Sequence, residues 1–189
     1  MKRRITAGAA ALAAGLAAGV AFAPAAHAEE ITCRGTLGAR TVDNLRVPQG
    51  GTCNLNGTRV KGTIKVQRNA TLQAVRVRVV GNVQGEGAAT VRVLQSSTVG
   101  GSVQLVKGGI ARVADSTVTG DILNDENRRA VSAVRNRVGG NIQAFKNTGG
   151  VTFSNNRVNG NLQCKENKPR PVGGGNIVQG NKEDQCSRL

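Results

Sequence analysis

A short phrase recurs along the chain at nearly constant spacing: a valine, any residue, a glycine, a small polar residue and an aliphatic residue, often followed by glutamine. It begins at Val60, Val79, Val99, Val118, Val138 and Val158, and a partial copy begins at Val178. The glycines at Gly62, Gly81, Gly101, Gly120, Gly140, Gly160 and Gly180 are therefore 19 or 20 residues apart. This period is typical of a solenoid, in which each repeat forms one coil and buries its apolar side chains by stacking on its neighbours.

Aliphatic residues occupy two fixed positions around each glycine. The valines stand two positions before it, and two positions after it come Ile64, Val83, Val103, Ile122, Ile142 and Leu162. A second apolar strand follows near mid-coil, at Leu72 and Val75, Val91 and Val93, Ile110 and Val113, Val131 and Val134, and Val151 and Phe153. β-Branched and aliphatic residues in such columns favour short strands that face a common interior.

These patterns predict an all-β fold, because no helical periodicity interrupts the repeats. We expect a single-stranded, right-handed parallel β-helix with about 20 residues per coil, since parallel crossovers are right-handed in nearly all proteins. Seven coil-to-coil steps of about 4.8 Å would give a rod roughly 35 Å long. An earlier, less regular coil places Asp43 at the glycine position, with Leu45 and Val47 after it and Leu55 in the second strand.

Two polar columns accompany the repeats. The position after the glycine holds Asn44, Thr63, Asn82, Ser102, Asp121, Asn141, Asn161 and Asn181, and the position three after it holds Lys65, Gln84, Gln104, Leu123, Gln143 and Gln163. Asparagine accepts turn conformations, and stacked amides bond one another along a rod. We interpret the first column as a ladder that stabilises the turns, with ligand binding as the alternative, and expect the second column outside.

The first 28 residues have the form of a secretory signal peptide: basic residues 2–4, an apolar run over residues 5–23 and a small-residue cleavage motif at residues 26–28. An uncleaved membrane anchor is the alternative. The predicted mature domain, residues 29–189, keeps 23 of the 26 Lys and Arg and all 11 acidic residues, a net charge of 23 − 11 = +12. We therefore expect a secreted protein without a transmembrane segment after cleavage.

The four cysteines of an exported chain predict two disulfides, and the repeat selects among the three pairings. Cys33 and Cys53 are 20 residues apart, and Cys164 and Cys186 are 22 apart, close to one coil in each case. Residues one coil apart lie roughly 4.8 Å from each other, within reach of a disulfide. We predict the pairs Cys33–Cys53 and Cys164–Cys186, one at each end of the rod; a metal site formed by free thiols is the alternative.

A column of basic residues stands three positions before the glycine and reads Arg40, Arg59, Arg78, Thr98, Thr117, Arg137 and Arg157. Alternation with the inward valine predicts that this column points outward, and Lys61, Lys65, Arg68, Arg76 and Arg135 are expected on the same general side. One interpretation is a candidate binding strip for an anionic cell-wall polymer or another extracellular polyanion. The other is that the charges keep an exposed sheet soluble. Without interleaved aromatic residues, sequence-specific nucleic-acid recognition is not expected.

Catalytic and metal-binding signals are sparse. The only histidine, His27, lies in the leader, and the chain has no Trp or Tyr. The one acidic cluster in sequence is Asp115, Asp121, Asp125 and Glu126, within a single coil. It supports an alternative function, a carbohydrate-active enzyme of the polysaccharide lyase or hydrolase type centred on Asp121. Because neighbouring coils add no acid in register, we expect a solvated turn, and therefore no catalytic residue, no metal and no cofactor.

The leader, the coils of the form VxGN[IV]Q and the tail CKENKPRPVGGGNIVQGNKEDQC, which spans residues 164–186, resemble small secreted β-helix proteins of high-GC Gram-positive bacteria. The coils are more loosely similar to the polymer-forming domains of bactofilins. The resemblance implies an exported right-handed β-helix and carries over no catalytic residue. We therefore expect a non-enzymatic structural or binding protein at the cell envelope. Self-association through an uncapped end coil is a further alternative.

Overall fold

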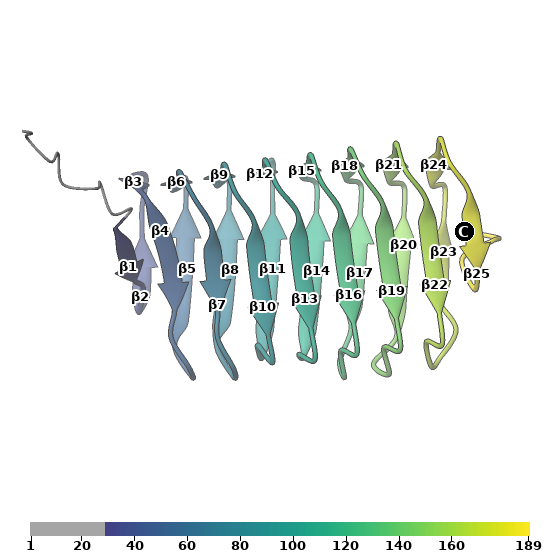
Figure 1. Cartoon of the computed structure of the whole chain (residues 1–189), viewed down its shortest axis with the longest axis horizontal. Helices are drawn as coiled ribbons and strands as arrows, with labels where there is room; N and C mark the ends of the chain where they lie inside the picture. Colours follow the sequence, from purple (N-terminus) through teal and green to yellow (C-terminus); the bar gives the residue numbers. More distant parts are fainter. Residues whose placement is uncertain (1–28) are drawn as a thin grey trace, which may run out of the picture.

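The chain winds into a rod of stacked coils in which every strand pairs in parallel with its equivalent one coil away. The computed structural model describes residues 29–189, all of it strand, turn and connecting backbone; the predicted signal peptide lies outside the described residues. In Figure 1 the nearer strands run downward, the fainter strands behind them run upward, and the chain advances from left to right, which makes the coil right-handed. The predicted solenoid with about 20 residues per coil is confirmed.

Three parallel sheets line the rod, one more than the two strand regions that the sequence suggests. Sheet A has nine strands: β1 (Glu30–Thr32), β4 (Asn44–Val47), β7 (Ile64–Val66), β10 (Val83–Glu86), β13 (Val103–Val106), β16 (Ile122–Asp125), β19 (Ile142–Phe145), β22 (Leu162–Lys165) and β25 (Lys182–Asp184). Its eight steps from strand to strand correspond to a length of about 38 Å, close to the expected rod.

Sheets B and C have eight strands each. Sheet B contains β2 (Gly35–Leu37), β5 (Thr52–Asn56), β8 (Thr71–Val75), β11 (Thr90–Leu94), β14 (Ile110–Ala114), β17 (Val131–Val134), β20 (Val151–Ser154) and β23 (Val172–Gly174). Sheet C contains the two-residue strands β3 (Thr41–Val42), β6 (Arg59–Val60), β9 (Arg78–Val79), β12 (Thr98–Val99), β15 (Thr117–Val118), β18 (Arg137–Val138), β21 (Arg157–Val158) and β24 (Ile177–Val178).

The predicted aliphatic columns form the core. The valines of sheet C from Val60 to Val158 and the first residues of the sheet A strands from Ile64 to Leu162 are all 0–1% exposed. The second apolar strand is predicted less well. On sheet B, the side chains of Leu72, Ala74, Val131 and Ala133 point into the core. The predicted inward residues Val75, Ile110 and Val134 lie half-buried on the outer face of the sheet.

The recurring glycine sits where the chain turns from sheet C to sheet A. A Cβ atom on Gly81 would lie 2.7 Å from the carbonyl oxygen of Gly62 and 2.8 Å from Oγ1 of Thr63, both in the preceding coil. Any larger residue would therefore push the coils apart, which explains why the phrase repeats glycine at this position.

The polar column after the glycine is a hydrogen-bonded ladder, as predicted for a turn-stabilising role. The side-chain oxygen of each member accepts a hydrogen bond from the backbone N–H of the next member. Oδ1 of Asn82 accepts from the N–H of Ser102 at 2.8 Å, and Oδ1 of Asn141 accepts from the N–H of Asn161 at 2.8 Å. In the glutamine column on the outer face of sheet A, the side chains bond each other. Nε2 of Gln84 donates to Oε1 of Gln104, and Nε2 of Gln143 donates to Oε1 of Gln163.

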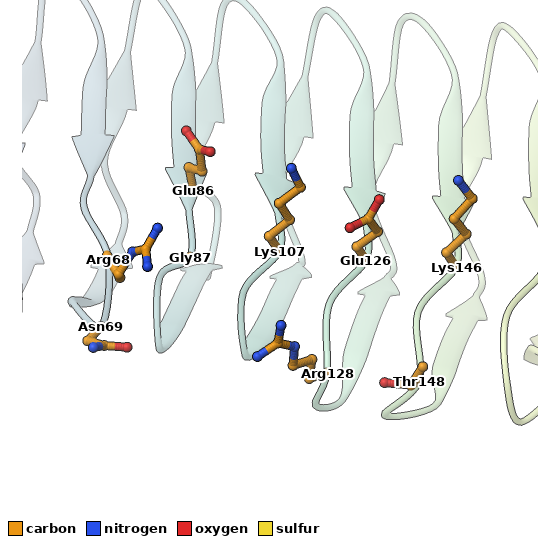
Figure 2. A pocket seen from close by; sticks show the side chains of 9 residues that line it. All are labelled: Arg68, Asn69, Glu86, Gly87, Lys107, Glu126, Arg128, Lys146 and Thr148. Atoms are coloured by element: carbon orange, nitrogen blue, oxygen red, sulfur yellow. The ribbon is translucent and has the colours of Figure 1, made fainter.

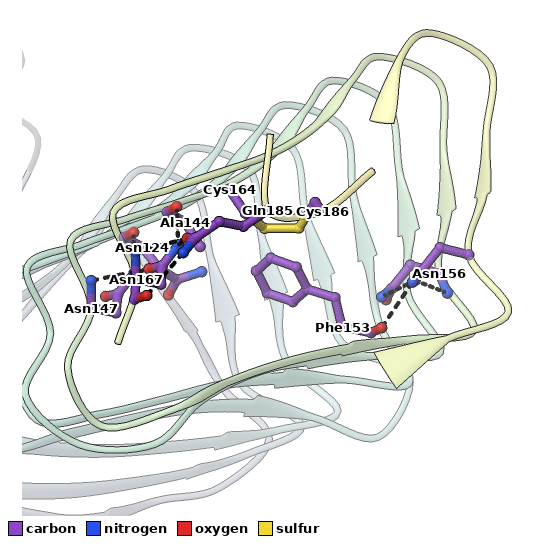
Figure 3. The surroundings of a disulfide bond; sticks show 10 residues. Asn124, Ala144, Asn147, Phe153, Asn156, Cys164, Asn167, Gln185 and Cys186 are labelled. Carbon is purple, nitrogen blue, oxygen red and sulfur yellow. Dashed lines mark hydrogen bonds between the residues drawn. A yellow bond between two sulfur atoms is a disulfide. The ribbon is translucent and has the colours of Figure 1, made fainter. Parts of the chain in front are cut away.

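Two further ladders are buried inside the rod, and the sequence reasoning missed both. One, at the turn from sheet A to sheet B, consists of Asn127, Asn147 and Asn167; the other, at the turn from sheet B to sheet C, consists of Asn136, Asn156 and Asn176. Each amide bonds its neighbour and a backbone carbonyl, as Figure 3 shows for Asn147, which donates to Asn167 and to the carbonyl oxygen of Asn124. Their 20-residue spacing is the signal in the sequence that could have revealed them.

Candidate functional site

The two disulfides form as predicted, one in the first coil and one in the last. Cys33 pairs with Cys53 at a Cα–Cα distance of 5.6 Å, and Cys164 pairs with Cys186 at 5.1 Å. The second bridge lies inside the last coil beside the buried ring of Phe153 (Figure 3). Since these are the four cysteines of the chain, the protein holds no free thiol for nucleophilic chemistry or metal binding.

The outward side chains of sheet C form one continuous column, which we call the C face: Thr41, Arg59, Arg78, Thr98, Thr117, Arg137, Arg157 and Ile177. Arg59 stands directly beside Arg78, and Arg137 directly beside Arg157. All four arginines are exposed, and within residues 29–189 none of them takes part in an ion pair. The predicted register and orientation of these four residues are therefore confirmed.

Arg40 does not belong to this column, so that prediction is wrong. Thr41 pairs with Arg59, because the turn from sheet C to sheet A is one residue shorter in the first coil than in the second. Three positions separate Val42 from Leu45, whereas four separate Val60 from Ile64. The sequence rule takes the residue three positions before the glycine position, which is Asp43 in this coil. Because the turn is one residue shorter here, the rule gives Arg40, whereas Thr41 is the residue in register with Arg59.

The other basic residues expected on this side divide among several surfaces. Lys65 lies on the outer face of sheet A, and Arg68 lies in the turn from sheet A to sheet B. Lys61, in the turn after sheet C, is paired with Asp43, with 2.9 Å between Nζ and Oδ1. This hydrogen bond and charge hold the pKa of Asp43 below its usual value.

Arg76 and Arg135 do lie beside the C face, in the turn from sheet B to sheet C. Arg76 donates to Asn56 Oδ1 at 2.8 Å. Arg135 makes a two-pronged contact with Asp115, at 2.6 Å from Nε to Oδ1 and 2.9 Å from the second nitrogen to Oδ2. This hydrogen bonding lowers the pKa of Asp115 and raises the pKa of Arg135. Arg135 is thus paired with a carboxylate, and within residues 29–189 the positive charge of this region that has no acidic partner comes from the C-face arginines and from Arg76.

A shallow hollow of about 560 Å3 lies along the second half of the C face, lined on one side by Thr98, Thr117, Arg137 and Arg157. Ser96 and the Asp115–Arg135 pair border it. Hydroxyl groups and guanidinium groups therefore converge on one open depression. Both are hydrogen-bond donors suited to anionic oxygens.

A second hollow, of about 600 Å3, lies at the opposite edge of the rod along the turns from sheet A to sheet B (Figures 1 and 2). One row of its charged side chains changes sign from coil to coil along the axis: Arg68, Glu86, Lys107, Glu126 and Lys146. Arg128 adds a further positive charge from the turn below this row. A polyanion that followed this row would meet attraction and repulsion in turn. The C face offers only positive charges to such a chain, which makes it the better candidate site.

The acidic residues of the Asp121 coil are not gathered into one site. Asp115 is paired with Arg135 in the turn before sheet C, Asp121 lies in the turn after it, and Asp125 and Glu126 follow at the far end of β16. Oδ1 of Asp121 accepts the backbone N–H of Asn141 at 2.6 Å as part of the turn ladder. Across residues 29–189 no three acidic, cysteine or histidine residues meet in a group that could hold a metal ion.

Comparison of the chain with protein-family models, with curated proteins and with solved structures finds no match. In residues 29–189 there is also no helix with the length and apolar character needed to cross a membrane. The geometry of the C face therefore carries the functional interpretation.

Proposed function

We propose that this protein is a secreted, non-enzymatic binding protein of the cell envelope that holds a linear polyanion on its C face. The observation that carries the proposal is the set of four exposed arginines that stand in register on one face without an acidic partner among residues 29–189. The two disulfides support export, because such bonds persist mainly in oxidising compartments.

The C face carries a like-charge strain that a bound anion would relieve. Neighbouring arginines stand on strands about 4.8 Å apart, and two like charges at that distance repel each other by roughly 1 kcal/mol in water. The C face has two arginine–arginine pairs in register, and the outer face of sheet B has one, Arg92 with Arg112. An anion seated between two such groups replaces repulsion by two charge-assisted hydrogen bonds.

The test is binding of a defined polyanion, such as inorganic polyphosphate, to the mature protein over a series of salt concentrations. Each phosphate contact contributes about 0.7 to 0.9 to the slope of log K against log salt, so four arginine contacts predict a slope near −3. Replacing Arg59, Arg78, Arg137 and Arg157 by Gln should flatten this slope and abolish binding at moderate salt.

A matched control removes the same number of charges from other surfaces. Lys107, Arg128 and Lys146 line the hollow along the turns from sheet A to sheet B, and Lys165 is the last residue of β22 on sheet A, so none of the four belongs to an arginine pair in register. Changing these four residues to Gln should leave most of the affinity in place. Equal losses in the two variants would contradict a specific role for the C face and leave only non-specific attraction to a basic protein.

A further inference from the structure

The arginines of the C face are not evenly spaced. Arg59 and Arg78 occupy adjacent coils, the next two coils present Thr98 and Thr117, and Arg137 and Arg157 then occupy the two coils after those. With about 4.8 Å per coil, the gap from Arg78 to Arg137 is about 14 Å, and the centres of the two pairs are about 19 Å apart along the axis.

We propose that each arginine pair is a separate anion seat, and that one linear phosphodiester chain, lying along the rod axis, occupies both seats at once. This inference rests on the proposed function and specifies its ligand class and orientation. A compact anion fills a single seat, because no small group spans 19 Å. A chain that reaches from seat to seat gains the second contact at high effective concentration.

The chemistry of the seats favours phosphate. Two arginines on strands about 4.8 Å apart can both direct their donor forks at one tetrahedral group, and arginine binds phosphate oxygens in this two-pronged way. Between the seats, Thr98 and Thr117 offer hydroxyl groups that donate to bridging phosphates without adding charge. The seats therefore bind strongly and the gap binds weakly.

The ion pair beside the gap strengthens this contrast. Asp115 belongs to the same coil as Thr117, and it neutralises Arg135 through both carboxylate oxygens. The guanidinium group of Arg135 is thus held by a carboxylate, and that of Arg76, at the other end of the gap, donates to the amides of Asn56 and Gln95. The negative charge of Asp115 also borders the hollow in which the chain would lie.

The C face contributes no aromatic side chain to stack on a base or a sugar. Of the three phenylalanines in the chain, Phe153 is completely buried, Phe145 lies on sheet A and Phe22 lies outside the described residues. Recognition would therefore depend on the phosphate spacing and not on the identity of the groups between phosphates. Nucleic-acid strands and polyol-phosphate polymers share that chemistry.

A length series tests the two-seat arrangement. Oligo(dT) strands from two to roughly twelve nucleotides are titrated against the mature protein at fixed salt. At about 3.4 Å or more per phosphate, seven phosphates, with about 20 Å from the first to the last, are enough to cover the 19 Å between the seats. We expect the affinity per strand to rise by about 10²-fold once a strand bridges both seats. A smooth increase in proportion to length, without a step, would overturn the inference. Glycerol-phosphate oligomers of matched length, run in parallel, show which backbone the seats prefer.

Three variants localise the step. Replacing Arg59 and Arg78, or Arg137 and Arg157, by Gln should reduce a long strand to the affinity of a short one, and the two double variants should behave alike. The control Lys107→Gln with Lys146→Gln removes two charges elsewhere and should keep the step.

Filling the gap gives the reciprocal result. Thr98→Arg together with Thr117→Arg makes the arginine column continuous, so the affinity should rise smoothly with strand length and the step should disappear. If the wild-type protein binds long strands but shows no step, the two-seat inference fails and the proposed function stands. If no phosphodiester chain binds even at low salt, the two-seat inference fails, and the proposed function fails with it if polyphosphate does not bind either.

Discussion

Asn156 offers the most direct test of how the coils are held together. Its side chain is 1% exposed and uses its full hydrogen-bonding capacity. Oδ1 accepts the backbone N–H of Asn136 at 3.0 Å and its Nδ2 at 3.1 Å. Nδ2 of Asn156 donates to the carbonyl oxygen of Ala133 at 2.8 Å and to Oδ1 of Asn176 at 2.9 Å. One amide thus connects three consecutive coils.

Replacing Asn156 by Ala removes all four bonds at once. The largest effect is on the backbone, because the buried N–H of Asn136 and the carbonyl of Ala133 both lose this partner. Leaving a buried polar group unsatisfied costs about 1–3 kcal/mol, so the two backbone groups predict a loss of about 2–6 kcal/mol in the free energy of unfolding. This is a large fraction of the stability of an ordinary domain, about 5–15 kcal/mol.

Asn161→Ala is the matched control, since Asn161 belongs to the half-exposed ladder at the turn from sheet C to sheet A. Its Oδ1 accepts only the exposed backbone N–H of Asn181, at 2.9 Å. Water can replace this bond, and we expect a loss of at most about 1 kcal/mol.

The measurement is urea unfolding of both variants, monitored by circular dichroism. The urea midpoints are compared on the condition that both variants have the same slope of unfolding free energy against urea concentration. The argument requires Asn156→Ala to be clearly the less stable protein. If the two variants unfold at the same urea concentration, the buried amides do not hold the coils together, and turn conformation and apolar packing must account for the register.

Three other predictions follow from charges and disulfides. Asp115→Asn should release Arg135 to the C face and steepen the salt dependence of polyanion binding by roughly one contact. The control Glu126→Gln makes the same charge change in the turn after β16 and should leave the salt dependence unchanged. Equal effects of the two variants would show that only net charge matters. Because Arg135 lowers the pKa of Asp115 from its usual 3.8, the pair stabilises the fold above that pH and its contribution is lost as the pH falls further. Acid unfolding of Asp115→Asn should therefore begin from a lower stability at neutral pH and depend less on pH below 3.8, and parallel curves for variant and wild type would contradict this. Replacing the cysteines of either disulfide by Ser should cost about 3 kcal/mol, from loops of 20 and 22 residues. Because the bridges lie at opposite ends of the rod, urea unfolding should give additive losses, and a strongly non-additive double variant would argue against independent clamps.

The architecture could be predicted from the sequence because one physical constraint is repeated seven times. Gly62 and its successors mark the same close approach between coils, so the chain can be aligned on them without knowing the structure. Once it is aligned, the inward valines, the turn ladder and both disulfides follow from the distance between coils.

The second strand was predicted less well because its inner face mixes large and small residues. Ala74 and Ala133 point into the core, where opposing side chains leave little room, and the larger Val75 and Val134 lie outside. Hydrophobicity alone therefore selected the larger residue of each pair. Strand alternation could have corrected the choice, because Leu72 and Val75 are three positions apart and cannot face the same side of a strand.

The error at Arg40 has a different origin. A single missing residue in the turn between Val42 and Leu45 shifts everything before it, and no glycine marks the turn in that coil. Irregular end coils lack the repeated reference that fixes the register elsewhere. The pairing of Arg135 with Asp115 likewise required the structure, because both residues stand in a turn with positive φ, at 54° and 53°, which aligns their side chains across one coil step.

The polar columns of this rod divide by whether their members bond one another. The asparagines and glutamines hold neighbouring coils together, so their positions are explained by stability alone. The paired arginines of the C face do the opposite, because each repels the next at the spacing of a single coil. A column that weakens the fold slightly, faces solvent and leaves its donors to water is not needed to form the solenoid. The outer face of sheet B carries one such pair, Arg92 and Arg112, whereas the C face carries two in a single column. This repetition along one column is the physical reason for assigning the binding function to the C face.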